Sequence, residues 1–344
     1  MEVNFPIDFV VTWLDPSDPE WQREFIKYKS EYTKTAYNSA ARYREWDLFR
    51  YWFRAVENYA PWVNKVFLVT NGKFPAWINE NNPKLVLVKH SDYIPTEYLP
   101  TFNSHTIELN MNKIPGLSEH FVYFNDDFYL NAPVSPEYYF KEGLPCDCNV
   151  ESVYSVPIYN KRDGFSISII KYTNIGVLNG HFKRRDIVKG HLKKWYGFHL
   201  GLAAQIMSLL VSCDPLGRFI GFVERHYEQP FLKSVLDEVW QQEPDMLSKS
   251  CCRFREDVNV SPYLFRYWQF ATNRFYPIKL THGVKYILIP DSIPQILKKL
   301  EDKNIWSLCA NDTTLISNED FEKLKPIVHA AFNRKFPKKS NYEL

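Results

Sequence analysis

The sequence predicts an α/β fold built on a mostly parallel sheet. Four short apolar runs, rich in β-branched and aromatic residues, lie in the first 130 positions at residues 7–14, 65–70, 85–89 and 121–124. Such uninterrupted runs are typical of strands that are buried on both faces. Stretches with helical spacing separate them, and strands that alternate with helices favour parallel pairing. We therefore expect a Rossmann-like core with an inserted helical segment.

Three helices are expected between these strands. Residues 20–37 are polar with spaced aromatics, and residues 46–58 place apolar side chains at helical intervals before Pro61. Residues 105–113 also have a helical pattern. Each of these segments precedes or follows a predicted strand, as in a βαβ arrangement.

The second half of the chain has a different pattern. Residues 131–180 alternate like strands with several turns, and residues 182–194 form a basic, helix-like stretch. Residues 200–211 are apolar, and residues 231–240 have the spacing of an amphipathic helix.

These segments are expected to form a single composite domain over residues 1–344, because no repeat or low-complexity linker separates them. Within it, residues 1–135 form a nucleotide- and metal-binding half. Residues 140–220 are an insertion, and residues 221–320 supply a second half of the site.

Composition excludes several classes of protein. The net charge is +2, so no global field favours nucleic acid as a partner. The first 16 residues lack the pattern of a signal peptide, and the apolar run at 200–211 is too short to span a bilayer. The cysteines fit neither a zinc site nor a small disulfide framework, and we expect reduced thiols: Cys146, Cys148, Cys213, Cys251, Cys252 and Cys309.

Acidic residues follow two of the predicted strands. Asp15 comes after the first strand, and Asp126 and Asp127 follow the fourth. Ligands of parallel sheets bind beyond the carboxyl ends of the strands, and adjacent carboxylates are oxygen ligands suited to Mg²⁺ or Mn²⁺. A strand-ending turn is an equally good interpretation, because Asn and Asp favour turns by themselves.

Asn103, Ser104 and Glu108 surround the start of a predicted helix. Capping of the first turn accounts for Asn103 and Ser104 better than chemistry does. Glu108 lies about one helical turn beyond Ser104 on the same side of the helix, and its role stays open.

Three basic residues of the second half are candidates for chemistry. His226 belongs to the residue type that carries protons near neutral pH, although a structural role is commoner for a lone His. Arg253 and Arg255 have the geometry to clamp phosphate oxygens. A salt bridge to Glu256 or Asp257 explains them equally well.

Taken in order, these stretches resemble the conserved regions of the Stealth family. IDFVVTWLDPSDPEW (7–21) resembles the first region, and the long stretch 42–130, which contains LPTFNSHTIE and HFVYFNDDF, resembles the second. GFVERHYEQPFLKSVLDEVW (221–240) with FREDVN (254–259) is similar to the third, and IWSLCAND (305–312) to the fourth. The family includes bacterial capsule polymerases and the catalytic subunit of the lysosomal-enzyme N-acetylglucosamine-1-phosphotransferase.

The resemblance implies a phosphotransferase with a GT-A-like nucleotide-sugar core and a divalent metal, Mg²⁺ or Mn²⁺. It implies that a hexose-1-phosphate moves from a UDP-sugar, such as UDP-N-acetylglucosamine, to a hydroxyl of a polysaccharide or oligosaccharide, with release of UMP. A metal-dependent glycosyltransferase that releases UDP is the alternative enzyme, and a carbohydrate-binding protein is the non-catalytic one.

Residue roles follow from the resemblance by position. Glu108 and Asp127 match acidic active-site residues of the family, His226 matches its active-site His, and Asp15 matches the residue after the first strand. The catalytic Arg stays open between Arg253, favoured by its spacing to the downstream Asp, and Arg255, favoured by the Phe-Arg dipeptide.

The remaining expectations concern substrate, metal and base. Arg44, Asn103 and Ser104 fall in the second region and are expected to bind substrate, as is Asp15. Asp126 with Asp127 is expected to hold the metal. His226 is expected to take the proton of the attacking hydroxyl, since a metal-bound carboxylate is a poor base.

A membrane role is a further expectation. Residues 182–198 place six basic residues beside Trp195, Tyr196 and Phe198, which suits an anionic membrane surface. A solvated basic helix is the stronger alternative. The expected location is cytoplasmic, with peripheral attachment to the inner face of the membrane.

Overall fold

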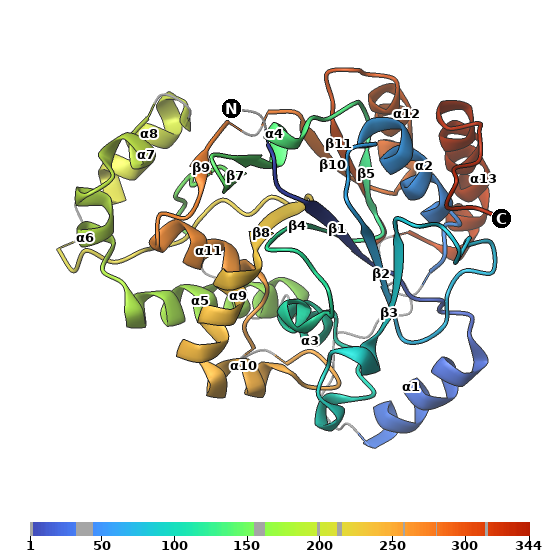
Figure 1. Ribbon diagram of the computed structural model, residues 1–344, viewed down its shortest axis with the longest axis horizontal. Coiled ribbons are helices and arrows are strands. Elements are labelled where there is room, and N and C mark those ends of the chain that lie inside the picture. The colour runs from blue at the N-terminus through green and yellow to red at the C-terminus, as the bar shows by residue number, and fades with distance from the viewer. Residues whose placement is uncertain are drawn as a thin grey trace.

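The computed structural model describes residues 3–31, 44–154, 162–197, 200–211, 215–256, 259–279, 281–313 and 316–344. Its central sheet has the strand order β3-β2-β1-β4-β8 (Figure 1). The strands are β1 (Ile7–Thr12), β2 (Val66–Thr70), β3 (Leu85–Lys89), β4 (His120–Phe124) and β8 (Gln229–Leu232). The first four pair in parallel, and β8 is antiparallel to β4. The predicted α/β fold with a mostly parallel sheet is confirmed.

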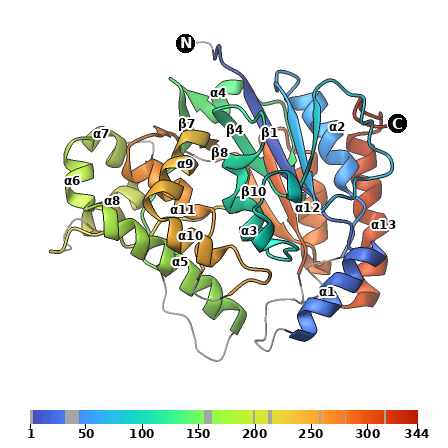
Figure 2. The same cartoon turned by 60° about the horizontal axis from the view of Figure 1, so that its bottom comes forward.

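Helices cover both faces of this sheet, which explains its uninterrupted apolar strands. On one side lie α2 (Phe49–Tyr59) and α13 (Asn318–Lys335), and on the other lie α3 (Ser104–Leu109) and α9 (Lys233–Gln242) (Figure 2). All five residues of β2 are buried as a result.

Two small sheets extend the molecule. One has the order β10-β11-β5 and the other β6-β7-β9. Their strands are β5 (Phe128–Leu130), β6 (Phe140–Lys141), β7 (Leu144–Asp147), β9 (Tyr276–Pro277), β10 (Gly283–Ile287) and β11 (Ser307–Asn311). Because β5 starts one residue after Asp127 and pairs with β11, the C-terminal part of the chain reaches the end of β4.

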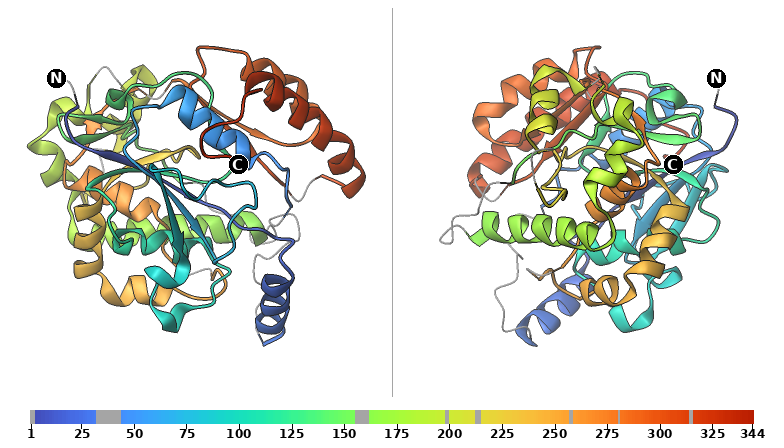
Figure 3. Two further views of the ribbon diagram at one scale, coloured as in Figure 1. Left: turned by 45° about the vertical axis from the view of Figure 1, so that its right-hand side comes forward. Right: turned by 90° about the vertical axis from the view of Figure 1, so that its left-hand side faces the viewer.

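The other helices lie around these sheets and at one edge. Five of them are α1 (Pro19–Glu31), α4 (Pro136–Tyr139), α10 (Pro244–Ser250), α11 (Tyr263–Ala271) and α12 (Ile293–Leu300). Residues 162–211 contain four more: α5 (Arg162–His181), α6 (Arg184–Lys189), α7 (Leu192–Trp195) and α8 (Leu202–Val211). Figure 3 (right) shows these four helices in light green to yellow, with α5 running across the molecule. None of the described helices is long and apolar enough to cross a membrane.

The strand expectation for residues 131–180 is confirmed at β6 and β7, but it is wrong for residues 162–180, because residues 162–181 form a helix. Tertiary packing overrides the β-branched composition here. Ile170, Asn174 and Leu178 are buried at four-residue intervals. Asn174 exchanges two hydrogen bonds with Ser261, at 2.8 and 3.0 Å, which fixes α5 to the segment before α11.

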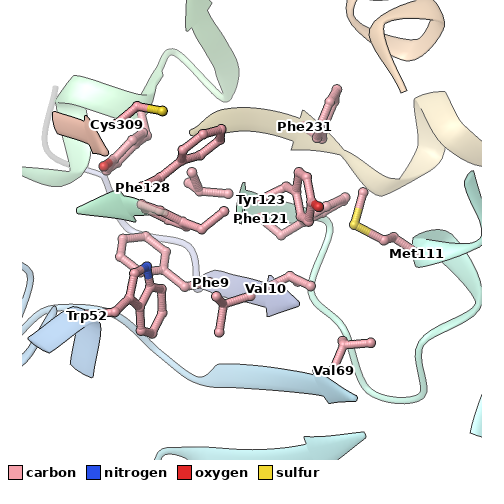
Figure 4. Close-up of a cluster of buried hydrophobic side chains, with 14 of the residues drawn as sticks. Phe9, Val10, Trp52, Val69, Met111, Phe121, Tyr123, Phe128, Phe231 and Cys309 are labelled. Carbon is pink, nitrogen blue, oxygen red and sulfur yellow. The ribbon is translucent and has the colours of Figure 1, made fainter. Parts of the chain in front are cut away.

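A continuous hydrophobic core joins the early and late parts of the chain. Phe9, Trp52, Phe121, Phe231 and Cys309 meet in it, from β1, α2, β4, β8 and β11 (Figure 4). The C-terminal strand is therefore part of the packing around β4, and that packing positions the loop that follows β4.

Candidate active site

A cavity of about 1060 Å³ lies at the carboxyl end of β4. Its walls come from segments that are far apart in the sequence: residues 44–49, α3, the turn 125–127, α5, residues 224–229, Arg255 and the pair β10–β11. This is the edge at which parallel sheets bind ligands.

Asp126 and Asp127 stand side by side in this cavity. Asp126 is exposed within the cavity. Desolvation by the cavity walls, with the charges of Asp127 and Glu45, raises the pKa of Asp126 above its usual value. Burial also raises the pKa of Asp127. Carboxylates this close repel each other unless a proton or a cation lies between them.

Strand β11 holds Asp127 in place. Nδ2 of Asn311 donates to Oδ2 of Asp127 at 2.8 Å, and the Cys309 thiol lies 3.6 Å from the same oxygen. The amide of Ala310 donates to the Asp127 carbonyl at 2.9 Å. Oδ1 of Asp127 is buried and has no partner among the described residues.

Glu108 reaches the cavity from α3. Asn103 caps this helix by accepting from the His105 amide at 3.1 Å, so Ser104 and Glu108 lie one turn apart on the cavity side. The Tyr123 hydroxyl lies 3.0 Å from Oε1 of Glu108. Burial raises the pKa of Glu108 to about 7, against the charge of Arg255. Glu108 is therefore poised to gain or lose a proton near neutral pH.

His226 lines the same cavity, packed edge-on against Phe128 with a centroid distance of 4.8 Å. Burial, and then the charges of Lys285 and Arg255, lower the pKa of His226 to about 3. The ring is neutral near pH 7, so it has a nitrogen lone pair with which to accept a proton.

The two candidate arginines are placed differently. Arg255 lines the cavity and donates to Oγ of Ser104 at 2.7 Å. Arg253 is exposed outside the cavity lining, where it donates to the Leu99 carbonyl at 3.2 Å and stacks over Tyr28 at 4.5 Å. The structure thus brings Arg255, and not Arg253, to the other candidates. Asp257, one proposed ion partner, lies outside the described residues.

Some of the residues expected to bind substrate line the cavity, and others lie outside its lining. Arg44 lines the cavity, 3.8 Å from Asp312, and donates to the Ile316 carbonyl at 3.2 Å. Asn103 is buried, is not part of the cavity lining, and caps helix α3. Asp15 is outside the cavity lining and accepts from the amide and hydroxyl of Ser17, at 2.9 and 2.6 Å, in the turn that the sequence offered as the alternative.

Several polar residues of the cavity had no signal in the sequence analysis. Glu45 faces Asp126 closely enough to raise its pKa. On the far wall, Lys171 of α5 forms an ion pair with Glu224 at 2.7 Å. Lys285 of β10 adds a cation near Asp127 and His226. Glu45, Glu224 and Asp312 lie in stretches that carry the family resemblance, but none of the three was singled out as a site residue.

The residues present fit a hard divalent cation. Asp126 and Asp127 offer carboxylate oxygens, and the buried Oδ1 of Asp127 still lacks a partner among the described residues. Donor atoms of Asp127, His226 and Cys309 lie within 4.8 Å of one another. Burial, with the charge of Asp127, raises the pKa of Cys309 well above its usual value. Sulfur is also a soft ligand, which suits a hard divalent cation less well than carboxylate oxygens do. The oxygen pair is therefore the part of this donor set that suits a hard divalent cation.

The thiols agree with the expectation in part. Cys146, Cys148, Cys251, Cys252 and Cys309 are free, and four of them are buried. The sixth, Cys213, lies outside the described residues.

The chain matches known protein family models and is similar to individual proteins of known name. Two family models match it: Stealth protein CR1, conserved region 1, over residues 5–33, and Stealth protein CR2, conserved region 2, over residues 42–146. It is similar to the capsular polysaccharide phosphotransferase WcwK of Streptococcus pneumoniae, with 38% identity covering 98% of each chain. It is also similar to the receptor polysaccharide phosphotransferase WefC of Streptococcus gordonii, with 37% identity covering 98% of this chain and 99% of that one.

Similarity extends to other genera and, weakly, to solved structures. The exopolysaccharide phosphotransferase cps2G of Lactiplantibacillus plantarum is 36% identical and covers 98% of this chain and 96% of its own. The galactosyltransferase LgtC, solved with donor and acceptor sugar analogs, overlaps 93% of this chain and 95% of its own with a TM-score of 0.33 and 9% identity. That overlap is too low to support any inference.

A carboxylate- and histidine-lined cavity at the edge of a mostly parallel sheet, in a chain with full-length phosphotransferase relatives, defines an enzyme of the transferase class. At 36–38% identity over 98% of its length, the chain belongs to the Stealth family of phosphotransferases.

Proposed function

We propose that this enzyme moves a hexose-1-phosphate, an N-acetylhexosamine-1-phosphate in our preferred form, from a UDP-sugar to a sugar hydroxyl. The product is a phosphodiester in a capsular or exopolysaccharide, and UMP is released. The names of the relatives support the acceptor class. The observation that carries the proposal is the meeting of Asp126 and Asp127 with His226 and Arg255 in one cavity.

Charge in the cavity suits a diphosphate. Arg44, Arg255 and Lys285 supply positive charge on several sides, and such groups stabilise the phosphate oxygens as charge shifts in the transition state. Asp126 and Asp127 would hold Mg²⁺ or Mn²⁺, which offsets the negative charge of the diphosphate when bound.

The reaction needs a base beside the diphosphate. The acceptor hydroxyl forms a bond to the sugar-linked (β) phosphorus, and the bond from that phosphorus to the bridging oxygen breaks, so that UMP leaves with this oxygen. Neutral His226 takes the hydroxyl proton. Burial, and then the charges of Lys285 and Arg255, lower the pKa of His226. A bound diphosphate counteracts these two charges and so strengthens this base. Glu108, whose pKa is about 7, is a second proton-exchanging group at the site.

A donor labelled with phosphorus-32 in its β-phosphate tests the route. We expect the label in the saccharide product and unlabelled UMP in solution, both lost in Asp127→Asn. Label recovered in UDP would overturn the proposal in favour of a glycosyltransferase, and no turnover with any UDP-sugar would favour a carbohydrate-binding protein.

The role of His226 has its own test. His226→Ala should lower turnover by about 10²–10⁴-fold, the usual range for a positioned base, while donor affinity measured by calorimetry stays within a few fold. Loss of donor binding in this variant would instead make His226 a binding residue.

We also propose that the enzyme works at the inner face of a membrane, where peripheral attachment would bring it to its acceptor. The basic stretch at 182–198 was the first reason for this idea. The structure changes which residues can serve it, because Trp195 is fully buried and Phe198 lies outside the described residues.

A further inference from the structure

Helix α8 exposes an apolar face to solvent. Leu202, Ile206 and Leu210 are 74%, 50% and 62% exposed, and their spacing of four residues places them on one face. The polar residue Ser208 is buried on the other side, and Gln205 donates back to the Gly197 carbonyl at 3.1 Å. A surface helix of a globular protein has the opposite arrangement, so this apolar face is suited to a non-aqueous neighbour.

The segment of sequence that contains this helix is rich in positive charge. Residues 182–211 contain six Lys or Arg and one Asp, whereas the whole protein has a net charge of +2. Lys183 and Lys189 flank and end α6, Lys193 lies in α7, and all three are exposed. Helices α6, α7 and α8 sit together at one edge of the molecule (Figures 1 and 2).

Two other basic residues of this segment, Arg184 and Lys194, bind neighbouring groups of the protein. Arg184 is buried in an ion pair with Glu151 at 2.5 Å and also donates to the Ser208 carbonyl at 3.3 Å. Lys194 donates to the carbonyls of Asn273 and Phe275, at 2.9 and 3.0 Å. The apolar helix is therefore fixed to the protein body with its apolar face outward.

We propose that α8 docks on an anionic lipid bilayer, with Leu202, Ile206 and Leu210 in the acyl boundary and Lys183, Lys189 and Lys193 near the headgroups. Ten residues cannot span a bilayer but are enough to lie in its interface. The basic surroundings favour an anionic bilayer over an apolar protein surface, because they add electrostatic attraction to apolar burial.

Helix α5 connects this surface to the active site. Its side chains Ile170 and Lys171 line the cavity, and its carboxyl end leads into α6. A helix of 20 residues is about 30 Å long. Docking through α8 thus fixes the distance and orientation of the cavity relative to the bilayer.

Co-sedimentation of the full chain with vesicles tests the surface. Phosphatidylcholine vesicles with and without phosphatidylglycerol are used at low salt and without donor, so the outcome does not depend on the chemistry of the enzyme. We expect the wild type to bind the anionic vesicles only. The variant L202E/I206E/L210E should bind on the order of 100-fold more weakly. The loss of one positive charge in K189Q or K193Q should cost about fivefold.

Ile327→Glu is the matched control. Ile327 is 46% exposed on α13, at the opposite edge of the molecule, so its variant should bind vesicles like the wild type. The triple variant must unfold in urea with the same midpoint as the wild type, which shows that it folds. Three results would overturn the proposal: no binding of the wild type, unchanged binding of the triple variant, or a dimer in sedimentation velocity that only the triple variant dissociates.

Discussion

Glu108→Gln should change how the stability of the protein depends on pH. Burial raises the pKa of Glu108 from its ordinary value of 4.5 to about 7. Below pH 4.5 the side chain is protonated in the folded and unfolded states alike. Between these two pKa values only the folded state keeps the proton, so stability falls as pH rises and levels off above pH 7. At 1.36 kcal/mol for each pKa unit, the unfolding free energy falls by about 3 kcal/mol in total over this range.

The glutamine variant keeps the size of the side chain and an oxygen facing Tyr123, but it has no proton to lose. Relative to the wild type, it should therefore gain about 3 kcal/mol of unfolding free energy between pH 4 and pH 8. Urea unfolding of both proteins at unit pH intervals measures this difference, and the titration of all other groups cancels.

Glu343→Gln gives a control of opposite sign. Burial alone would raise the pKa of Glu343, but its bidentate pairing with Arg54 outweighs burial and lowers it. This variant should lose stability relative to the wild type as pH rises, over the range just below and around pH 4.5. A pH-independent difference for Glu108→Gln, or one that favours the wild type at high pH, would refute the assignment of a buried, proton-retaining Glu108.

Other predictions concern the cavity and the insertion. Arg255→Ala should reduce turnover by roughly 10²–10³-fold, as for other groups that stabilise transition-state charge, whereas Arg253→Ala should stay within about threefold; equal losses in steady-state assays would contradict this. Asp127→Asn should abolish turnover and leave thermal unfolding cooperative, and the wild type should lose activity in EDTA and regain it with Mg²⁺ or Mn²⁺. Arg184→Met should cost about 3–5 kcal/mol in urea unfolding, because it leaves the Glu151 carboxylate buried without its partner; a cost below 1 kcal/mol would show that water reaches this pair.

The central sheet was predictable because burial on both faces leaves a strong local signal. The apolar runs of β1, β2, β3 and β4 appear at the predicted places within one or two residues. Strand β8 was missed: its four residues include a Pro and merge with the following helix in the sequence pattern. Helix α5 was assigned to the wrong class, since its contacts with the segment before α11 are set by the fold and not by local propensity.

The candidate site was predictable where a motif and a strand end coincide. Asp126 and Asp127 follow from such a coincidence, whereas Glu108 was singled out by the family resemblance; the structure brings all three together with His226. The choice between Arg253 and Arg255 was beyond the sequence, because two positions in an irregular loop decide which side chain enters the cavity. Lys171 and Lys285 had no signal, since they sit on elements that reach the cavity only through tertiary packing.

The support of Asp127 by β11 has a consequence for protein synthesis. Asn311 is made 184 residues after Asp127, which at a usual rate of about 5–20 residues per second is roughly 10–40 s later. Throughout that interval the nascent chain carries its carboxylate pair without the strand that orients it. Activity should therefore appear abruptly, late in translation, and stalled chains that end before β11 should be inert even where the central sheet has already formed.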